Sequence, residues 1–327
     1  MRLIHNSTLV RHNALRRLKS DIARVKGSIT ALVTPFHNGC VDDKALGKLC
    51  ERQIERGTVA LVVSGSTGEA TSLSVAEQVC VLRIAFDAAS SRVPIIAGCC
   101  APTTEEAVIL GGAAAQNGAS ALLCAPPPYC RPTQDGIAAH VRAVAHASDL
   151  PVILYDVPGR IGVAIEDETV ARLHEAGLIV AIKDAAEDPS RPVRLRALCG
   201  KDLLQFTGDD ATAAAHRAMG GRGCISVTAN LAPALCGQMH AAWDLADLAE
   251  FDRIRDLLAP LHQALFRESN PIPVKAALCM IGLCHGELRL PLTRASSATL
   301  DALGLLLPDL MRAEDGAARR PRLTLVT

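Results

Sequence analysis

The residue most able to do chemistry closes an apolar segment. Residues 178–185 read LIVAIKDA, five apolar residues followed by Lys183. A lysine is rarely left in such a place unless it is paired or reactive. Burial disfavours the ammonium form, and a neutral amine adds to carbonyls and can form a Schiff base. Lys183 is therefore the candidate nucleophile. The alternative is an ion pair with Asp184, although adjacent strand residues point to opposite faces.

Hydroxyl groups follow similar apolar segments. The chain has two tyrosines, Tyr129 after ASALLCAP and Tyr155 within PVILYDVP. Either ring alone could serve packing, with its hydroxyl satisfied. Because both tyrosines, like Lys183, come near the end of a predicted strand, we expect their hydroxyls to move protons beside the lysine.

The segment SGSTGEA has the composition of an anion-binding loop. Gly65 and Gly68 free the backbone, so that N–H groups can converge on an anion before the next helix. Ser66 and Thr67 add hydroxyl donors. Arg160, in VPGRIG, offers a fork for a second carboxylate, unless it is a plain surface arginine. These residue types predict a Schiff-base lyase or aldolase that holds a small 2-oxo acid.

Eight short apolar segments, separated by helical patterns, must position these residues. They cover residues 28–35, 60–65, 93–98, 119–126, 151–158, 178–184, 203–208 and 223–228. This repetition predicts an α/β fold, a TIM (β/α)8 barrel, rather than an open doubly wound sheet. No G-x-G-x-x-G follows the first segment, which removes support for a dinucleotide site. Active residues of such barrels lie at the C-terminal ends of strands, where these candidates fall.

The chain divides into four predicted segments. Residues 1–26 form a basic N-terminal extension with seven Lys and Arg against one acid. A targeting peptide, an extra helix and an upstream start all remain open for it. Residues 27–230 form the barrel, 231–313 a C-terminal helical domain, and 314–327 a loosely ordered tail.

Composition argues against several other classes of protein. The formal net charge is zero, so nothing global favours nucleic acid. No apolar segment reaches the ~18 residues of a membrane span, and no secretion signal is visible. The twelve cysteines lack a C-x-x-C pair, which favours free thiols in a reducing cytoplasm over disulfides or zinc. We expect no metal and no cofactor.

The sequence resembles the dihydrodipicolinate synthase and N-acetylneuraminate lyase family of class I, pyruvate-dependent aldolases. The resemblance runs from about Gly27 to about Leu310. The motifs that carry it, in the family's order, are GSITALVTP, GSTGEATSL, YCRPTQDG, ILYDVPGRIG, AIKDA, TGDDA, GCISVTAN, NPIPVK and LRLPLT. It implies a TIM barrel with a C-terminal helical domain, usually a tetramer built as a dimer of dimers, without a cofactor beyond the pyruvate imine.

The resemblance implies a role for each matching residue. Lys183 matches the Schiff-base lysine, and Tyr155 the tyrosine that relays protons near the imine. Ser66 matches the relay hydroxyl, where the synthases usually have threonine. Tyr129 matches the tyrosine that completes the relay of a neighbouring subunit. Thr67 matches the residue that holds the pyruvate carboxylate.

Substrate-binding roles follow in the same way. Arg160 matches the arginine that receives the aldehyde substrate's carboxylate, and sialic acid lyases have none there. Ile225 matches a residue that lines the pocket through its backbone, and Gly65 and Gly208 are expected to contact substrate. The resemblance thus implies condensation of pyruvate with aspartate 4-semialdehyde to 4-hydroxy-tetrahydrodipicolinate, in lysine and diaminopimelate biosynthesis. Another pyruvate aldolase or dehydratase acting on a sugar acid or hydroxy-oxo acid, or a silent regulatory paralogue, remains open.

Several positions depart from the family pattern. Asp156 and Cys130 stand where asparagine is common, and Ile161 where threonine is usual, so the second substrate could differ. At the lysine feedback site, Pro102 replaces an asparagine and Pro128 a tyrosine. Proline cannot supply the lost side-chain hydrogen bonds. We therefore expect weak or absent inhibition by lysine.

Overall fold

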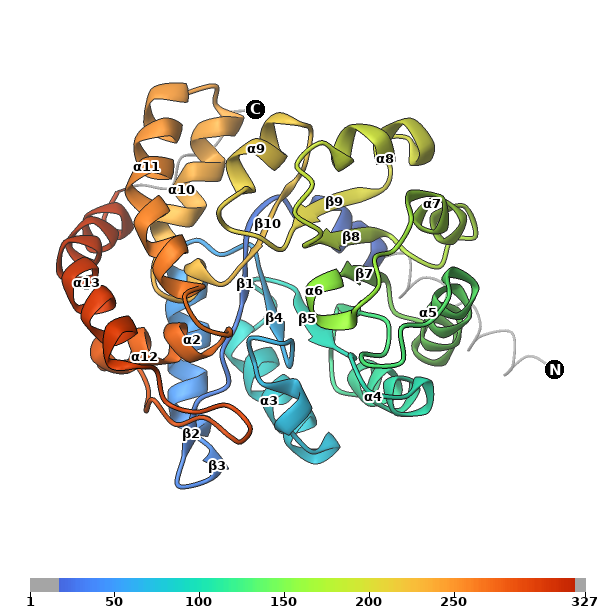
Figure 1. Cartoon of the computed structure of the whole chain (residues 1–327), viewed down its shortest axis with the longest axis horizontal. Coiled ribbons are helices and arrows are strands. Elements are labelled where there is room, and N and C mark those ends of the chain that lie inside the picture. Colours follow the sequence, from blue (N-terminus) through green and yellow to red (C-terminus); the bar gives the residue numbers. More distant parts are fainter. Residues whose placement is uncertain (1–17, 321–327) are drawn as a thin grey trace.

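A computed structural model of the chain describes residues 18–320, in which eight parallel strands close into a barrel (Figure 1). Around the barrel the strands follow the order β1-β10-β9-β8-β7-β6-β5-β4. Their bounds are β1 Gly27–Ala31, β4 Ala60–Val63, β5 Ile95–Gly98, β6 Ala121–Cys124, β7 Val152–Asp156, β8 Ala181–Asp184, β9 Leu204–Thr207 and β10 Gly223–Ser226. The predicted TIM barrel is confirmed, and each predicted apolar segment contains one of these strands, except that β1 begins one residue before its segment, at Gly27.

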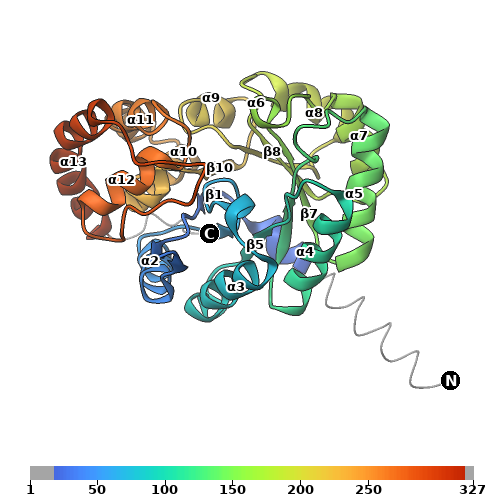
Figure 2. The ribbon, with the colours of Figure 1, turned by 60° about the horizontal axis from the view of Figure 1, so that its bottom comes forward.

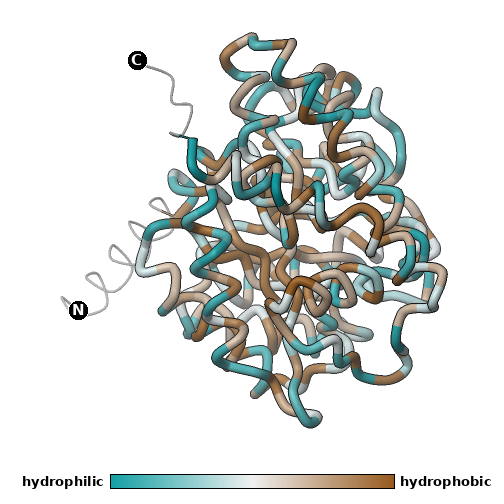
Figure 3. Tube along the Cα trace, turned by 90° about the vertical axis from the view of Figure 1, so that its left-hand side faces the viewer, coloured by the Kyte–Doolittle hydropathy of each residue, from teal (hydrophilic) through white to brown (hydrophobic). Residues whose placement is uncertain are grey.

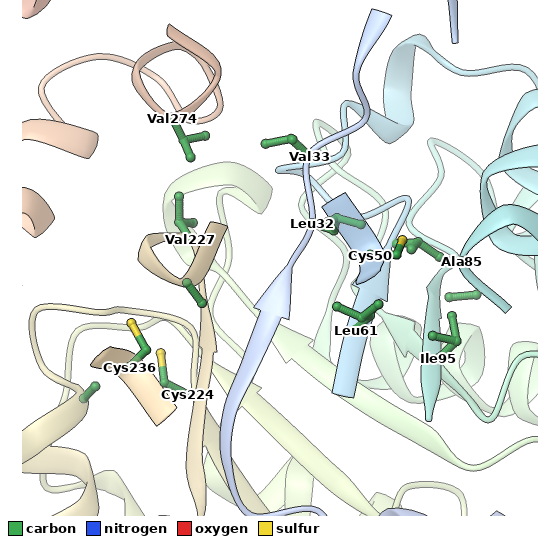
Figure 4. Packing of buried hydrophobic residues seen from close by; sticks show 14 of the residues in the cluster. Leu32, Val33, Cys50, Leu61, Ala85, Ile95, Cys224, Val227, Cys236 and Val274 are labelled. Carbon is green, nitrogen blue, oxygen red and sulfur yellow. The ribbon is translucent and has the colours of Figure 1, made fainter. Parts of the chain in front are cut away.

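The strands are apolar because both of their faces are covered. Along β7, Ile153 and Tyr155 belong to the cluster inside the barrel, whereas Val152 and Leu154 pack outward against the helices. Figure 4 shows part of the outer layer, with Leu61 and other buried side chains between strands and helices. Figure 3 shows apolar stretches running through the middle of the molecule. The alternation decides which side chains reach the barrel interior.

Helices surround the barrel (Figure 2). They are α2 Asp43–Glu55, α3 Val75–Ala89, α4 Thr104–Gln116, α5 Gln134–Ser148, α6 Pro158–Ile161, α7 Asp167–Glu175, α8 Arg191–Cys199 and α9 Ala213–Ala218. Short 3₁₀ turns, η1 Ala70–Ser72 and η2 Thr228–Asn230, and a small antiparallel pair, β2 Phe36–His37 with β3 Cys40–Val41, complete this part. Helix α3 starts at a capping box, in which the side chains of Ser74 and Glu77 each accept from the other's backbone N–H.

Four further helices pack on one side of the barrel (Figure 1). They are α10 Pro233–Asp244, α11 Leu248–Leu265, α12 Ile272–Met280 and α13 Ser297–Ala318. The predicted loose tail from 314 is wrong for residues 314–318, which continue α13. The reason is Glu314, whose buried carboxylate accepts from the N–H groups of Ala234 and Leu235 at the start of α10. Burial raises the pKa of this carboxyl, and those N–H donors oppose the rise.

The end of the N-terminal extension belongs to the barrel core. Residues 18–24 are helical, and Ile22 and Val25 are buried in the same cluster as the inner strand residues. The predicted extension therefore supplies apolar side chains to the barrel interior before β1 begins. Residues 1–17, on which the targeting interpretation depends, and residues 321–327 lie outside the described part of the chain.

Two predictions from composition concern the whole chain. None of the helices within residues 18–320 combines the length and the apolarity needed to cross a membrane. All twelve cysteines are free thiols, of which Cys50, Cys99, Cys124, Cys224 and Cys236 are buried. Cys40, Cys130 and Cys279 are exposed.

Candidate active site

Lys183 and Tyr155 lie side by side inside the barrel. They are register partners on β8 and β7, and the Nζ atom of Lys183 lies 4.1 Å from the centroid of the Tyr155 ring. Both side chains are buried, at 4% and 6% exposure. Lys183 pairs with no carboxylate among residues 18–320. Asp184 faces the other side of the strand, where it pairs with Arg191, so the ion-pair alternative for Lys183 is not what the structure contains.

Gly208 leaves the space that the lysine side chain occupies. It follows β9, and a Cβ atom added to it would come within 2.7 Å of Cε of Lys183. The Gly208 N–H donates to the carbonyl oxygen of Asp184 at 2.6 Å, so the backbone cannot easily retreat. A side chain at this position would have to displace the lysine.

The predicted anion loop lies at the end of β4. Ser64 turns the chain with a φ of 52°, and Gly65 accepts from the N–H groups of Gly68 and Ala70. Ser66 is half-buried and Thr67 is buried. Within the described residues, the backbone N–H groups of Ser66 and Thr67 make no hydrogen bond. Two donors are thus free to meet an anion at this turn.

Asn270 is the site residue that sequence reasoning missed. It stands in the quoted motif NPIPVK and is buried, at 7% exposure. Its Nδ2 atom donates to the Thr67 hydroxyl at 2.9 Å, while its carbonyl oxygen accepts from the Arg160 guanidinium at 3.0 Å. Its Oδ1 atom has no partner among the described residues. Asn270 therefore joins the anion loop to Arg160, an exposed residue of α6.

Two isoleucines singled out by the sequence belong to the apolar interior of the barrel. Ile225 of β10 and Ile161 of α6 are both buried in the inner cluster that also contains Tyr155. Ile161, where the family usually has threonine, therefore adds an apolar side chain to that cluster.

Asp156, by contrast, is adjacent to Tyr155 in sequence but faces outward. Its carboxylate accepts from the Arg191 guanidinium at 2.6 Å, and the same guanidinium reaches Asp184 at 3.3 Å and the carbonyl of Ile165 at 2.5 Å. Burial raises the pKa of both carboxyls, and Arg191 opposes that rise. Asp156 belongs to a buried ion cluster that fastens the ends of β7 and β8, so its effect on the second substrate is not direct.

A second buried ion pair fastens the anion loop to α12. The ammonium of Lys275 lies 2.6 Å from the Glu69 carboxylate and donates to the carbonyl of Thr34 at 2.9 Å. Burial lowers the pKa of Lys275, and Glu69 opposes that effect. Glu69 also accepts from the N–H of Arg289 at 3.0 Å. Because Glu69 follows Thr67 and Lys275 follows Asn270, the pair supports the contact between those two residues.

The end of β10 is held by Asp210, in the motif TGDDA. Its carboxylate accepts from the hydroxyl of Ser226 and from the N–H groups of Val227 and Thr228 at 2.8 and 3.0 Å. These bonds fix the turn directly after Ile225. Asp210 thus fixes the position of Ile225 through the turn that follows it.

Among the predicted catalytic residues, Tyr129 does not pack beside Lys183 within the single chain. Its side chain is 99% exposed, and its φ of 74° is unusual for a tyrosine. The adjacent Cys130 is exposed as well. The ring therefore projects from the rim and does not pack beside the lysine.

The side chains offer no obvious metal centre. Within the described part of the chain, no three His, Cys, Asp or Glu side chains are grouped so as to hold a metal ion. The arrangement offers the buried amine of Lys183 next to the phenol of Tyr155. On the same rim, Asn270 connects the backbone donors of the anion loop to the guanidinium of Arg160.

Known proteins are similar to this chain in both sequence and fold. The profile of the dihydrodipicolinate synthetase family matches residues 24–309. The chain is 48% identical over 278 residues to the 4-hydroxy-tetrahydrodipicolinate synthase of Rhodospirillum centenum, covering 85% of this chain and 96% of that one. It is also 48% identical to the enzyme of the same name from Parvibaculum lavamentivorans, over 84% of this chain and 94% of that one.

Solved structures of dihydrodipicolinate synthases have a similar fold. A dihydrodipicolinate synthase from Acinetobacter baumannii, complexed with pyruvate, has a TM-score of 0.85 at 43% identity, covering 88% of this chain and 99% of that one. The 4-hydroxy-tetrahydrodipicolinate synthase of Methylacidiphilum fumariolicum has a TM-score of 0.86 at 34% identity, over 90% and 99% of the two chains.

Proposed function

The chain belongs to the dihydrodipicolinate synthetase family, and from that premise we propose that it is a 4-hydroxy-tetrahydrodipicolinate synthase, which joins pyruvate to aspartate 4-semialdehyde through a Schiff base on Lys183. It is a class I lyase. The observation that carries the proposal is the buried Lys183 amine 4.1 Å from the Tyr155 ring, in a chain 48% identical to named synthases.

Lys183 carries the covalent steps. Its unprotonated amine adds to C2 of pyruvate, water leaves, and an imine forms. Loss of a proton from C3 gives an enamine, whose carbon attacks the aldehyde carbon of the semialdehyde. The amino group of the semialdehyde then attacks the imine carbon, releases Lys183 and closes the ring. No further cofactor takes part in this sequence.

Hydroxyl groups move the protons in this proposal. The phenol of Tyr155 is the neighbour of the amine and serves as its proton donor and acceptor. Ser66 takes the relay position in the anion loop. Tyr129 reaches a neighbouring subunit, which agrees with its full exposure on the single chain.

Two subsites hold the two carboxylates. The free N–H groups of Ser66 and Thr67 receive the carboxylate of pyruvate, and Gly65 keeps that turn compact. Arg160 receives the carboxylate of the semialdehyde. The guanidinium donates to the backbone carbonyl of Asn270 in the free protein. It either keeps that bond or gives it up when it binds the substrate carboxylate. Ile225 and Gly208 line the space around the lysine.

The relay role of Tyr129 requires at least a dimer, and a dimer of dimers is the assembly we propose. We also propose that the protein acts in the cytoplasm as a homotetramer.

Borohydride trapping tests the chemistry. Reduction in the presence of pyruvate should give a mass adduct on the peptide that contains Lys183, and Lys183→Ala should give none. Absence of an adduct on the wild-type protein would refute the proposal. A substrate panel follows, in which aspartate 4-semialdehyde should be turned over with a higher kcat/KM than sugar acids or hydroxy-oxo acids. A preference for one of those would assign the chain to another aldolase of the family.

A further inference from the structure

The motif LRLPLT provides an arginine, Arg289, that the proposed reaction does not use. It lies in the segment between α12 and α13, residues 281–296, which contains no helix or strand and runs beside the β2–β3 hairpin (Figure 1). The Arg289 side chain is 21% exposed. Its guanidinium donates to the carbonyl oxygens of Ser72 and Gly39, at 2.8 and 2.7 Å. Arg289 thus joins its own segment to the hairpin and to the end of η1, which follows the anion loop.

Glu77 fixes the position of the Arg289 guanidinium. Its two carboxylate oxygens accept from Nη1 and Nη2 of Arg289 at 3.0 and 2.5 Å, the paired geometry that a guanidinium forms with a carboxylate. These hydrogen bonds are the main cause that lowers the pKa of Glu77 to about 2, so its carboxylate is charged near pH 7. The guanidinium also lies 4.4 Å from the ring of the buried Phe36. The contacts together restrict the guanidinium to one orientation.

The backbone of Arg289 contacts the anion loop through Glu69. Its N–H donates to Oε2 of Glu69 at 3.0 Å, while the ammonium of Lys275 donates to Oε1 at 2.6 Å. Both oxygens of this buried carboxylate are therefore held, each by a different segment of the chain. Because the guanidinium anchors the residue, it also fixes the N–H group that Glu69 accepts from.

Glu69 needs this support because its backbone is strained. Its φ of 54° lies in the left-handed region, which a residue with a Cβ atom rarely adopts. The residue directly follows the turn 65–68, in which the free N–H groups of Ser66 and Thr67 lie. Strained backbone of this kind persists where the surrounding structure holds it, and it gathers at functional sites. The direction of the two donors therefore depends on the contacts of the Glu69 carboxylate.

We propose that Arg289 is a positioning residue of the pyruvate subsite, which acts through Glu69 to aim the free N–H groups of the anion loop at the substrate carboxylate. This inference rests on the proposed function, in which those N–H groups receive the carboxylate of pyruvate. A small displacement of such donors weakens binding strongly. Without Arg289, the carboxylate of pyruvate should be held less well, whereas a carbonyl group should react with Lys183 as before.

Imine trapping with two carbonyl compounds separates positioning from folding. Acetone has a methyl group where pyruvate has its carboxylate, so it can form an imine with Lys183 without using the anion loop. Cyanoborohydride reduces both imines, and mass spectrometry measures the adduct on the Lys183 peptide as each compound is titrated. For Arg289→Met we expect half-saturation at about tenfold more pyruvate, the effect of about one hydrogen bond, and unchanged trapping of acetone. An unfolded fraction would reduce both adducts alike.

Steady-state kinetics and matched variants complete the test. In Arg289→Met the KM for pyruvate should rise about tenfold while kcat stays within about twofold. Arg289→Lys should recover part of the loss, since it keeps the charge but not the fork. Arg294→Met, which changes an exposed residue of the same segment, should behave as the wild type. If Arg289→Met folds poorly, Glu77→Gln keeps an oxygen for the capping box but loses the charge, and should require about threefold more pyruvate.

Failure of the inference and failure of the proposed function give different results. Absence of a pyruvate adduct on Lys183 in the wild type would refute the proposed function itself. A normal adduct in the wild type, with unchanged pyruvate saturation in both Arg289→Met and Glu77→Gln, would overturn the positioning role alone. Equal losses for pyruvate and acetone in these variants would overturn it as well, because they would show that Arg289 serves only the stability of the fold.

Discussion

The amide of Asn270 donates to the hydroxyl of Thr67 across 2.9 Å, although 203 positions separate the two residues in the chain. The same asparagine accepts from Arg160 through its carbonyl oxygen. One residue therefore connects the two proposed carboxylate subsites. The buried ion pair Glu69–Lys275 holds together the two segments that carry Thr67 and Asn270.

Replacing the Asn270 side chain should weaken the proposed pyruvate subsite, whereas Arg160 keeps its bond to the backbone carbonyl of residue 270. Asn270→Ala removes the donor to Thr67, and we expect about a tenfold loss of kcat/KM for pyruvate, the effect of about one hydrogen bond. Steady-state kinetics would measure this. In a double-mutant cycle with Thr67→Val, the two losses should be less than additive. Full additivity would mean that the contact has no functional role.

Arg160→Ala should separate the two substrates. The guanidinium is proposed to hold only the semialdehyde carboxylate, so KM for the semialdehyde should rise about 30-fold or more while KM for pyruvate changes little. Arg160→Lys keeps the charge but loses the fork, and should fall between the two. Unchanged turnover of the semialdehyde in Arg160→Ala would show that the assigned role is wrong.

Arg191 should matter more for stability than its neighbour Arg194. Arg191→Met leaves the buried carboxylates of Asp156 and Asp184 without a counter-charge, which should cost about 3–5 kcal/mol near pH 7. Arg194→Met, on the same helix, removes only half-exposed ion pairs and should cost less than about 1 kcal/mol. Urea unfolding at matched protein concentration compares the two variants.

The loss in Arg191→Met should also depend on pH. Burial raises the pKa of both carboxyls in the folded protein, and without Arg191 nothing comparable opposes it. The folded variant then binds protons more readily than its unfolded chain, so its stability rises as pH falls toward the raised pKa values. We expect the deficit to be smaller at about pH 5.5 than at about pH 7.5. A deficit that grows on acidification would contradict this explanation.

Subunit mixing tests the role of Tyr129. Tyr129→Phe and Lys183→Ala should each be nearly inactive alone, but a co-expressed mixture should regain activity. In a hybrid dimer, the Lys183 of one subunit meets the Tyr129 of its partner, which gives one complete site. Random pairing makes about half of the dimers hybrid, so about a quarter of wild-type activity is expected. No recovery, despite hybrids shown by native mass spectrometry, would place the relay within one chain.

Lysine should inhibit weakly or not at all. By the family resemblance, Pro102 and Pro128 match feedback-site positions that hold an asparagine and a tyrosine in the synthases. The carbonyl of Pro128 accepts from the N–H of Cys130 at 2.9 Å. We expect activity to stay within about twofold at millimolar lysine, since the side-chain hydrogen bonds are absent. Strong inhibition in a titration of the purified enzyme would refute this, and Pro102→Asn would then show whether the asparagine adds further sensitivity.

Local sequence signals determined a large part of the fold. The eight strands and the position of Lys183 follow from apolar segments that end in polar residues, because a strand buried on both faces must be apolar along its length. Strand alternation, read in the same way, separated Lys183 from Asp184. The family motifs added the roles of Thr67, Arg160 and Tyr155.

Tertiary structure decided the rest, because contacts between distant positions leave no periodic trace in a sequence. Asn270 could be assigned only once α12 and the β4 loop were side by side. Asp156 was a candidate site residue because it is adjacent to Tyr155 in the sequence. Only its ion pair with Arg191 showed that its carboxylate faces away from the barrel interior. The contacts of Arg289 emerged in the same way, since the partners of a polar side chain depend on what folding places around it.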